Sequence, residues 1–385
     1  MIPYGKQDIS QDDIDAVVNV LKSDYLTQGP HVPAFEEVMA NYCNADYAVA
    51  VNSATSALHI ACLSLGLEEG DWLWTSPNTF VASANCGIYC GAQVDFVDID
   101  PDTYNMCVVQ LEKKLILAKK TSTLPKIVIP VHFAGQSCDM KKIKGLSEEY
   151  GFKIIEDASH AIGGKYLNEN VGCCKYSDIT VFSFHPVKII TTAEGGLATT
   201  NQENLANKML LLRGHGITRD PKLMSQEPDG GWYYQQLDLG FNFRMTDLQA
   251  ALGISQFKRL DAFVEKRHRL KERYDELLKD FPIKIPYQNP ACYSALHLYP
   301  ILIELDKIGK SHAQIFDELR AAGLGVNVHY IPVHTQPFYQ NLGFKKGDFP
   351  LSEKYYSTEI SIPLYHTLSK KDQDFVVTAL KDVVN

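Results

Sequence analysis

Short apolar runs alternate with longer mixed segments through the first half of the chain. Their lengths and β-branched residues are typical of buried strands, and they lie at residues 47–51, 72–75, 94–97, 126–131, 153–156, 179–184 and 196–199. The segments between most of them show helical patterns and can form the crossovers that parallel strands require. This alternation predicts a three-layer α/β domain. Because the last run follows the sixth so closely, we expect those two strands to pair antiparallel.

The pattern changes in the last third of the chain. Residues 246–278 are amphipathic and rich in i, i+4 charge pairs, which predicts one long helix. Beyond it, strand-like runs at 298–305, 325–330 and 359–362 and helical patterns at 311–322 and 370–384 predict a small α+β unit. We place a domain boundary inside the long helix, near Gln256. The expected division is a large domain of residues 1–255 and a small C-terminal domain of residues 256–385.

The first candidate for chemistry is Lys188. It lies just beyond the strand-like run 179–184, which Pro186 ends. Burial there would lower the pKa of the amine, because a buried site disfavours the charged form. A neutral amine can attack a carbonyl and form a Schiff base. The alternative is an ordinary solvated lysine, so the neighbourhood has to decide between them.

Asp157 supplies the second half of that neighbourhood, because it closes the apolar run 153–156. A crossover and a strand fit between Asp157 and Lys188, so the two side chains can lie at neighbouring strand ends. Pyridoxal phosphate needs a carboxylate opposite its lysine, since the acid keeps the pyridine nitrogen protonated and lets the ring accept electrons. Alone, Asp157 would be interpreted as a helix cap or loop acid. Its pairing with Lys188 favours the cofactor role.

A third element follows the run 47–51. Asn52, Ser53, Ala54 and Thr55 open an apolar helix there. A strand, a short turn and a helix N-terminus form an anion site, because free backbone N–H groups and the helix dipole point to one place. Ordinary capping would explain the same residues on its own. The sequence has no Walker lysine and no Gly-x-Gly-x-x-Gly turn to indicate a nucleotide cofactor instead.

Together these elements resemble the DegT/DnrJ/EryC1/StrS family of sugar aminotransferases, which belongs to the fold-type I pyridoxal-phosphate enzymes. The resemblance runs essentially end to end, through motifs at residues 25–30, 52–58, 79–85, 156–163, 183–196 and 240–245. It implies a three-layer α/β/α large domain with a mostly parallel seven-stranded sheet, and a smaller α+β C-terminal domain. It also implies pyridoxal 5'-phosphate as the cofactor and a homodimer whose active sites are shared between subunits.

The resemblance assigns roles to individual residues. Lys188 would bind the cofactor covalently and move protons during the reaction, and Asp157 would pair with the pyridinium nitrogen. Phe80 would stack on the cofactor ring, where an aromatic face suits a flat heterocycle. The remaining contacts to the ring hydroxyl and the phosphate would come from Ala54, Thr55, His160, Ser183 and, reaching in from the neighbouring subunit, Asn242.

The reaction type follows from Lys188. Relatives that remove a sugar hydroxyl carry His in its place, so the lysine favours transamination from L-glutamate to a ketosugar. Segment 25–30 and segment 328–334 resemble members that aminate C4 of a UDP-linked 4-keto-6-deoxy-N-acetylhexosamine of the L-altrosamine precursor type, in pseudaminic acid biosynthesis. Candidate substrate contacts are Tyr25, Thr27, His329, Tyr330 and His334. Another nucleotide-linked 4-ketosugar stays open, and a sugar dehydratase or a non-catalytic regulatory relative is a minor alternative.

Composition agrees with an enzyme of this kind. The 385 residues are 45% hydrophobic and 22% charged, which is enough for a large core. The net charge of −9, without a basic run, argues against nucleic-acid binding. No apolar stretch approaches the roughly 20 residues of a membrane helix, and the first residues lack a signal-peptide core. We therefore expect a cytoplasmic protein without a membrane partner.

Four further features of the sequence lie outside these assignments. The nine cysteines have no metal-like or disulfide spacing, so we expect free thiols. His329 and His334 are five residues apart, but Ile331-Pro332 breaks a helical register between them, and we predict no metal site. Residues 218–232 form a loop that either closes over a nucleotide or lies on the surface. Ala193 replaces a glycine common in the family, and we expect little effect from its methyl group.

Overall fold

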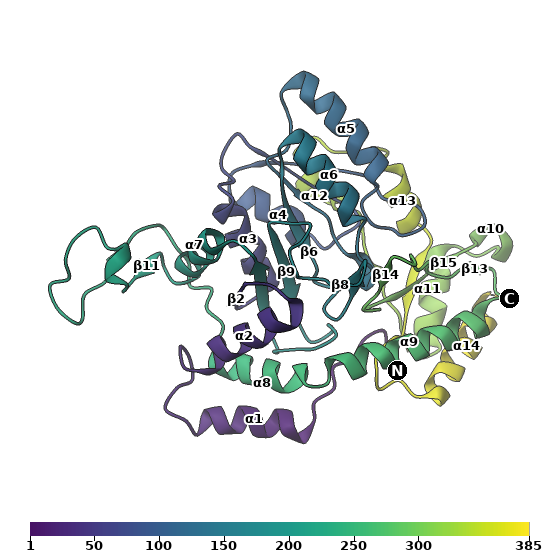
Figure 1. The fold of residues 1–385 in the computed structure, drawn as a ribbon. Coiled ribbons are helices and arrows are strands. Elements are labelled where there is room, and N and C mark those ends of the chain that lie inside the picture. Colours follow the sequence, from purple (N-terminus) through teal and green to yellow (C-terminus); the bar gives the residue numbers. More distant parts are fainter. Residues whose placement is uncertain (385) are drawn as a thin grey trace.

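The centre of the molecule is a seven-stranded sheet with the order β2-β10-β9-β6-β5-β3-β4 (Figure 1). The computed structural model describes residues 1–384. All seven predicted strands are confirmed, as β2 (Tyr47–Val51), β3 (Trp72–Thr75), β4 (Gln93–Phe96), β5 (Ile127–Ile129), β6 (Lys153–Asp157), β9 (Ile179–Ser183) and β10 (Gly196–Thr200). β10 pairs antiparallel with β9, as expected, and also with β2, and the other neighbours are parallel.

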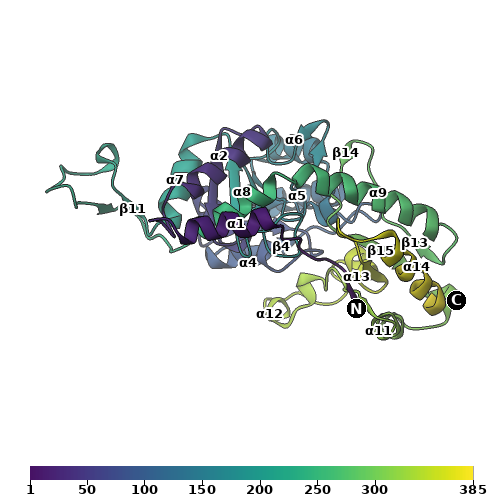
Figure 2. The same ribbon diagram turned by 90° about the horizontal axis from the view of Figure 1, so that it is seen from below.

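Helices cover both faces of this sheet, so the predicted three-layer architecture is confirmed (Figures 1 and 2). Successive strand residues point to opposite faces. Leu73 packs in the core beneath α3 (Ala54–Ser64), α4 (Ala82–Tyr89) and α7 (Glu203–Arg213), whereas Trp74 packs beneath α5 (Val108–Thr121) and α6 (Met140–Tyr150). Towards β2 and β10, the second face is covered by α2 (His31–Cys43) and α8 (Asp247–Phe257), with α1 (Gln11–Leu21) packed on α8.

The single long helix predicted over residues 246–278 is wrong, because two helices occupy this stretch. α8 ends at Phe257 and α9 (Leu260–Leu278) begins three residues later. Arg259 leaves the helical conformation at the break, with φ −109° and ψ 1°, and its guanidinium binds the carboxylates of Asp8 and Asp13. The amphipathic pattern continues across the break, so the sequence pattern did not reveal that the helix ends there. The domain boundary near Gln256 falls in the last turn of α8 and stays a prediction.

The C-terminal region is built on a three-stranded antiparallel sheet of β13 (Ile283–Lys284), β15 (Tyr299–Ile303) and β17 (Glu359–Ile362). Side chains of α9, α11 (His312–Ala321) and α14 (Lys370–Val384) pack with it. The strand predicted over 325–330 is largely wrong. β16 covers only Leu324–Gly325 and pairs with β1 (Ile2–Pro3) instead of joining the larger sheet. Residues beyond it turn toward a cavity described below.

Smaller elements connect these parts. β7 (Lys165–Tyr166), β8 (Glu169–Asn170) and β14 (Cys292–Tyr293) form a second three-stranded sheet. α10 (Leu305–Ile308), α12 (Pro337–Gln340) and α13 (Pro350–Tyr356) are short helices of the C-terminal half. Within residues 1–384, no helix is long and apolar enough to cross a membrane.

One segment departs from the compact body. Between α7 and α8, β11 (Ile217–Thr218) pairs antiparallel with β12 (Gln235–Gln236), and the loop between them extends away from the body in both views (Figures 1 and 2). We call residues 217–240 the arm. Because the arm points away from the rest of the chain, it does not close over a cavity of the same chain.

Candidate active site

A cavity of about 840 Å³ lies at the carboxyl edge of the large sheet. Three strands that run in the same direction, β2, β6 and β9, end there. The residues at or just beyond their ends are Asn52, Asp157 and Ser183, and all three line the cavity. Ligands of open α/β sheets bind at this edge, because connections diverge there and leave a crevice.

The cavity floor is an anion cradle made by the start of α3. Ser53 caps the helix, its hydroxyl accepting the N–H of Ser56 at 3.1 Å. The N–H groups of Ala54 and Thr55, in the first turn, have no acceptor inside the helix and are free for a ligand. Gly196 makes this possible, because a Cβ there would overlap the backbone of Ser53 and Ala54. The cradle therefore fits a phosphate group.

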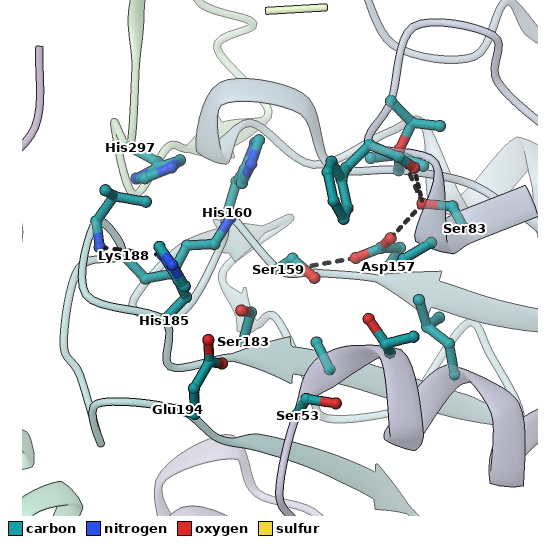
Figure 3. A pocket seen from close by; sticks show the side chains of 18 of the residues that line it. Ser53, Ser83, Asp157, Ser159, His160, Ser183, His185, Lys188, Glu194 and His297 are labelled. Carbon is teal, nitrogen blue, oxygen red and sulfur yellow. Dashed lines mark hydrogen bonds between the residues drawn. The ribbon is translucent and has the colours of Figure 1, made fainter. Parts of the chain in front are cut away.

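Asp157 is held in one orientation at the end of β6. Its Oδ2 accepts a hydrogen bond of 2.6 Å from the hydroxyl of Ser83, and its Oδ1 accepts one of 3.1 Å from the N–H of Ser159 (Figure 3). Ser83 in turn lies 2.8 Å from the hydroxyl of Thr79. The carboxylate is buried, yet it lines the cavity. It can therefore face a protonated ring nitrogen.

Lys188 reaches the same cavity from the connection between β9 and β10, near His160 and His185 (Figure 3). Burial lowers the pKa of its amine to about 8, and the charge of Asp157 opposes that shift. A substantial fraction of the amine is thus neutral near pH 8, as a nucleophile requires. The structure brings Lys188 and Asp157 to one cavity.

Two neutral histidines form a further part of the wall. The Nε2 of His160 lies 3.0 Å from the hydroxyl of Tyr330, and the ring of His297 lies 4.4 Å from that of His160. Burial lowers the pKa of both imidazoles well below the usual value. The Nδ1 of His160 is buried without a hydrogen-bond partner among residues 1–384. Such an orphaned polar atom is costly, which suits a wall completed by a bound molecule.

Phe80 completes the fit to a flat ring. It lines the cavity and leaves 60% of its surface exposed, although it is a large aromatic residue. Stacking on a planar cofactor would cover this face. A phosphate cradle, a fixed carboxylate, a lysine and an exposed aromatic face therefore suit pyridoxal phosphate, whereas no group of three or more candidate metal ligands occurs in the part of the chain that the structure describes.

Most of the residues predicted from the sequence meet at this cavity. Those that line it are Ala54, Thr55, Phe80, Asp157, His160, Ser183, Lys188, His329 and Tyr330. His334 does not. It is fully buried against Phe96 and Phe349, and its Nε2 lies 2.9 Å from a carboxylate oxygen of Glu353. His334 is therefore a buried packing residue, and its predicted contact with the substrate is corrected.

Three other predicted residues lie outside the cavity of a single chain. Tyr25 is 56% exposed, and Thr27 forms a β-bridge with Thr246 at the start of α8. Asn242 lies just beyond the arm and is exposed. Its carbonyl oxygen accepts a hydrogen bond of 3.4 Å from the side chain of Asn52, so it is close to the rim of the cradle.

Several cavity residues were not predicted. They include Tyr4, Asn52, Ser83, Ser159, His185, Glu194, Gln249, His297 and Asn327. Most are within a few residues of a predicted contact, and the motifs at 79–85, 156–163 and 183–196 could have indicated them. Tyr4 and His297 are distant from every predicted contact in the sequence, and no local pattern marks them.

The fold and this site define a pyridoxal-phosphate-dependent aminotransferase. The chain belongs to the DegT/DnrJ/EryC1/StrS aminotransferase family, whose sequence profile matches residues 7–381. It is 39% identical to a UDP-4-amino-4,6-dideoxy-N-acetyl-beta-L-altrosamine transaminase of Campylobacter jejuni, covering 100% of this chain and 98% of that protein. It is 38% identical to the spore coat polysaccharide biosynthesis protein SpsC of Bacillus subtilis, covering 100% and 97%.

Solved structures agree with that membership. The aminotransferase PseC of Helicobacter pylori, described as involved in the biosynthesis of pseudoaminic acid, matches with a TM-score of 0.91 at 30% identity, over 100% of this chain and 99% of that one. The putative sugar aminotransferase Spr1654 of Streptococcus pneumoniae, solved in its PMP form, matches with a TM-score of 0.90 at 30% identity and the same coverage.

Proposed function

We propose that this enzyme transfers the amino group of L-glutamate to C4 of a UDP-linked 4-keto-6-deoxy-N-acetylhexosamine of the L-altrosamine precursor type, in pseudaminic acid biosynthesis. The observation that carries the reaction type is the convergence of Lys188 and Asp157 on one cavity, above the anion cradle of α3. The sugar is supported by the likeness to the transaminase of Campylobacter jejuni over the whole chain.

Each side chain has a task in this proposal. When bound, pyridoxal phosphate supplies an electron sink for the carbanion formed at the reacting carbon. The Nζ of Lys188 takes the proton from the α-carbon of the donor and returns a proton to C4 of the sugar, as a general acid–base catalyst. The carboxylate of Asp157 keeps a proton on the pyridine nitrogen, and Ser83 and Ser159 hold that carboxylate in place.

The remaining contacts position the cofactor. Ala54 and Thr55 bind the phosphate through the free N–H groups of α3, with the hydroxyl of Ser183 beside them. Phe80 would stack on the ring, and His160 would lie beside its hydroxyl. His329 and Tyr330 face the sugar from the C-terminal half.

The homodimer is part of the proposal. The arm exposes large apolar side chains away from its own body, at Leu223, Trp232, Tyr234 and Leu239. Exposed apolar groups gathered on a projection favour a protein partner, and a second copy of this chain fits the expected role of Asn242 at the neighbouring cradle. Each active site would then contain residues of both subunits.

A second sugar class has support of its own. SpsC of Bacillus subtilis is about as similar to this chain as the transaminase of Campylobacter jejuni, yet its name places it in spore coat polysaccharide biosynthesis. One extra or missing methyl group changes binding by only ~1–3 kcal/mol. Another nucleotide-linked 4-ketosugar is therefore the second candidate, whereas the presence of Lys188 disfavours a dehydratase.

The test separates the reaction from the sugar. L-Glutamate is added to the cofactor-loaded enzyme, and absorbance follows conversion to the pyridoxamine phosphate form. UDP-4-keto-6-deoxy sugars of both configurations are then offered. Recovery of the original spectrum with the L-altrosamine precursor alone supports the proposal, and recovery with another sugar alone changes the substrate. No response to any amino donor contradicts the aminotransferase.

Lys188→Ala is the matched loss-of-function variant. We expect it to lose the covalent cofactor absorbance and turnover together. Lys175→Ala is the control, because Lys175 is a surface lysine paired with Glu169. Full turnover in Lys188→Ala would remove Lys188 from the mechanism.

A further inference from the structure

A buried carboxyl group lies behind the cavity wall and has no part in the proposed chemistry. Glu359, at the start of β17, is fully buried. Its Oε2 accepts the backbone N–H of His329 at 2.7 Å, and its Oε1 lies 2.6 Å from the hydroxyl of Ser361. Within residues 1–384 it forms no ion pair. Burial raises the pKa of this carboxyl to about 8, and the two hydrogen bonds oppose the shift only in part.

Hydrogen bonds connect Glu359 to the cavity. The hydroxyl of Ser361 is 2.9 Å from Nδ1 of His329, and Nε2 of His329 is 3.3 Å from the side-chain nitrogen of Asn327. His329 and Asn327 line the cavity, whereas Ser361 is fully buried. Nε2 is therefore the ring nitrogen on the cavity side. Burial lowers the pKa of His329 to about 3, so its ring stays neutral and carries one N–H.

The direction of these hydrogen bonds depends on the charge of Glu359. An ionised carboxylate only accepts, so Ser361 donates its single proton to Oε1. The oxygen of Ser361 must then accept from His329, which places the imidazole proton on Nδ1. Nε2 is left with a lone pair on the cavity side, where Asn327 donates to it.

Protonation of Glu359 reverses the direction of the hydrogen bonds between Glu359, Ser361 and His329. The carboxyl then donates to Ser361, and Ser361 donates to Nδ1 of His329, which must be unprotonated. The imidazole proton sits on Nε2, and the side chain of Asn327 must turn its amide oxygen toward Nε2 to accept that proton. A proton taken up at Nε2 is thus balanced by one proton passing from Nδ1 to Ser361 and one from Ser361 to Glu359. The ring stays neutral throughout, and the carboxylate loses its charge.

We propose that Glu359, acting through Ser361, decides which ring nitrogen of His329 carries the proton, and so whether Nε2 offers the sugar a hydrogen-bond acceptor or a donor. The sugar part of this inference rests on the proposed function. With Glu359 ionised, a hydroxyl or an amide N–H of the N-acetylated sugar donates to the single lone pair of Nε2 in place of the side chain of Asn327. His329 then contacts the substrate, and Glu359 and Ser361 are positioning residues.

Other titratable groups face the hydrogen bonds that connect Glu359, Ser361 and His329, and these groups define the conditions of the test. The phenols that feel the charge of Glu359 are Tyr104, Tyr330 and Tyr355, and burial raises the pKa of each. The ring of Tyr4 packs edge-on to His329 at 5.0 Å, and His312 binds only the backbone carbonyl of Glu359. The charge of Lys188 also reaches His329. Because the amine of Lys188 titrates near the same pH, the experiment uses the cofactor-loaded enzyme.

Glu359→Gln tests the relay without changing its shape. The amide oxygen keeps the bond from the N–H of His329, so the amide nitrogen donates to Ser361 and fixes the proton on Nε2 at every pH. Nitrogen-15 NMR of histidine-labelled enzyme reads the tautomer, with the signal of His329 assigned from its loss in His329→Asn. We expect the wild-type proton to move from Nε2 to Nδ1 as the pH rises through about 8. The same tautomer in both proteins at every pH would overturn the relay.

The kinetic measurements test the proposed contact between His329 and the sugar. With Nε2 fixed as a donor above pH 8, Glu359→Gln should raise KM for the ketosugar about tenfold, while its cofactor affinity stays within about twofold. Ser361→Ala, the second variant, should lose the pH-dependent change of tautomer. Glu353→Gln is the control, since Glu353 binds His334 away from the cavity. A changed tautomer with an unchanged KM would overturn the sugar contact. Failure of the wild type to use any ketosugar would instead contradict the proposed function, because the NMR result needs no sugar.

Discussion

Lys188 owes its expected reactivity to its surroundings, so its behaviour should follow pH. Burial lowers its pKa from 10.5 to about 8. Below that pH the amine is protonated and cannot attack a carbonyl, and above it the amine is free. We therefore expect the rate at which apoenzyme covalently captures added pyridoxal phosphate to rise with pH and level off above about 8. Stopped-flow absorbance measures this rate. A midpoint near the ordinary lysine value would contradict the burial effect.

Asp157→Asn is the matched variant for that profile. The charge of Asp157 raises the pKa of Lys188, so its removal should move the midpoint of the capture rate to lower pH. Because the same change removes the partner of the pyridine nitrogen, turnover should fall as well. An unchanged midpoint would show that the two side chains are not electrostatically coupled.

Ala193 corrects an expectation about a single methyl group. Its φ of 67° lies in the left-handed region, which costs a residue with a Cβ about 1–2 kcal/mol. A glycine at this position would avoid that cost. Ala193→Gly should raise the free energy of unfolding by roughly 0.5–1 kcal/mol after the greater backbone freedom of glycine is subtracted. Urea denaturation measures it, and Ala34→Gly, inside α2, should lower stability instead. A loss of stability in both variants would contradict the strain.

At the scale of elements, sequence patterns located strands better than they located breaks. The runs at 47–51 and 72–75 match β2 and β3 residue for residue, because strands covered on both faces need continuous apolar side chains. The helix over 246–278 failed because Arg259 breaks it through contacts with Asp8 and Asp13, which lie far away in the sequence. The strand predicted over 325–330 is largely wrong because its alternating apolar and polar residues beyond Gly325 do not belong to a sheet. His329 and Tyr330 line the cavity instead.

The contact between β10 and α3 gives the prediction at this scale. Gly196 passes against the backbone of the cradle, and an added methyl group would push the start of α3 away. Gly196→Ala should therefore weaken pyridoxal phosphate binding at least about tenfold, since the N–H groups of Ala54 and Thr55 would no longer converge. Equilibrium titration followed by absorbance measures it. Gly145→Ala, which has open space inside α6, is the control and should not change cofactor affinity. Equal affinity in both variants would contradict the close approach.

For the whole molecule, the residues that converge from distant segments were the hardest to predict. Tyr4 and His297 reach the cavity only because β1 pairs with β16 and because the segment after β14 contacts the turn near Gly135. Neither event leaves a periodic signal in the sequence. Lys188 and Asp157 were predictable because both follow strands that end at one edge of the sheet.

The proposed sharing of each active site between two subunits predicts complementation between two defective subunits. Lys188→Ala removes the reacting amine, and Asn242→Ala removes the contact proposed to reach the neighbouring cradle, so each homodimer should be impaired. In a mixed dimer, one site combines Lys188 of one subunit with Asn242 of the other and is intact. We therefore expect unfolded and co-refolded mixtures, or co-expressed pairs, to be more active than the sum of the separate variants. Sedimentation must show dimers in every sample. Activity equal to the sum, with mixed dimers demonstrated by differently tagged chains, would place Asn242 in its own subunit's site.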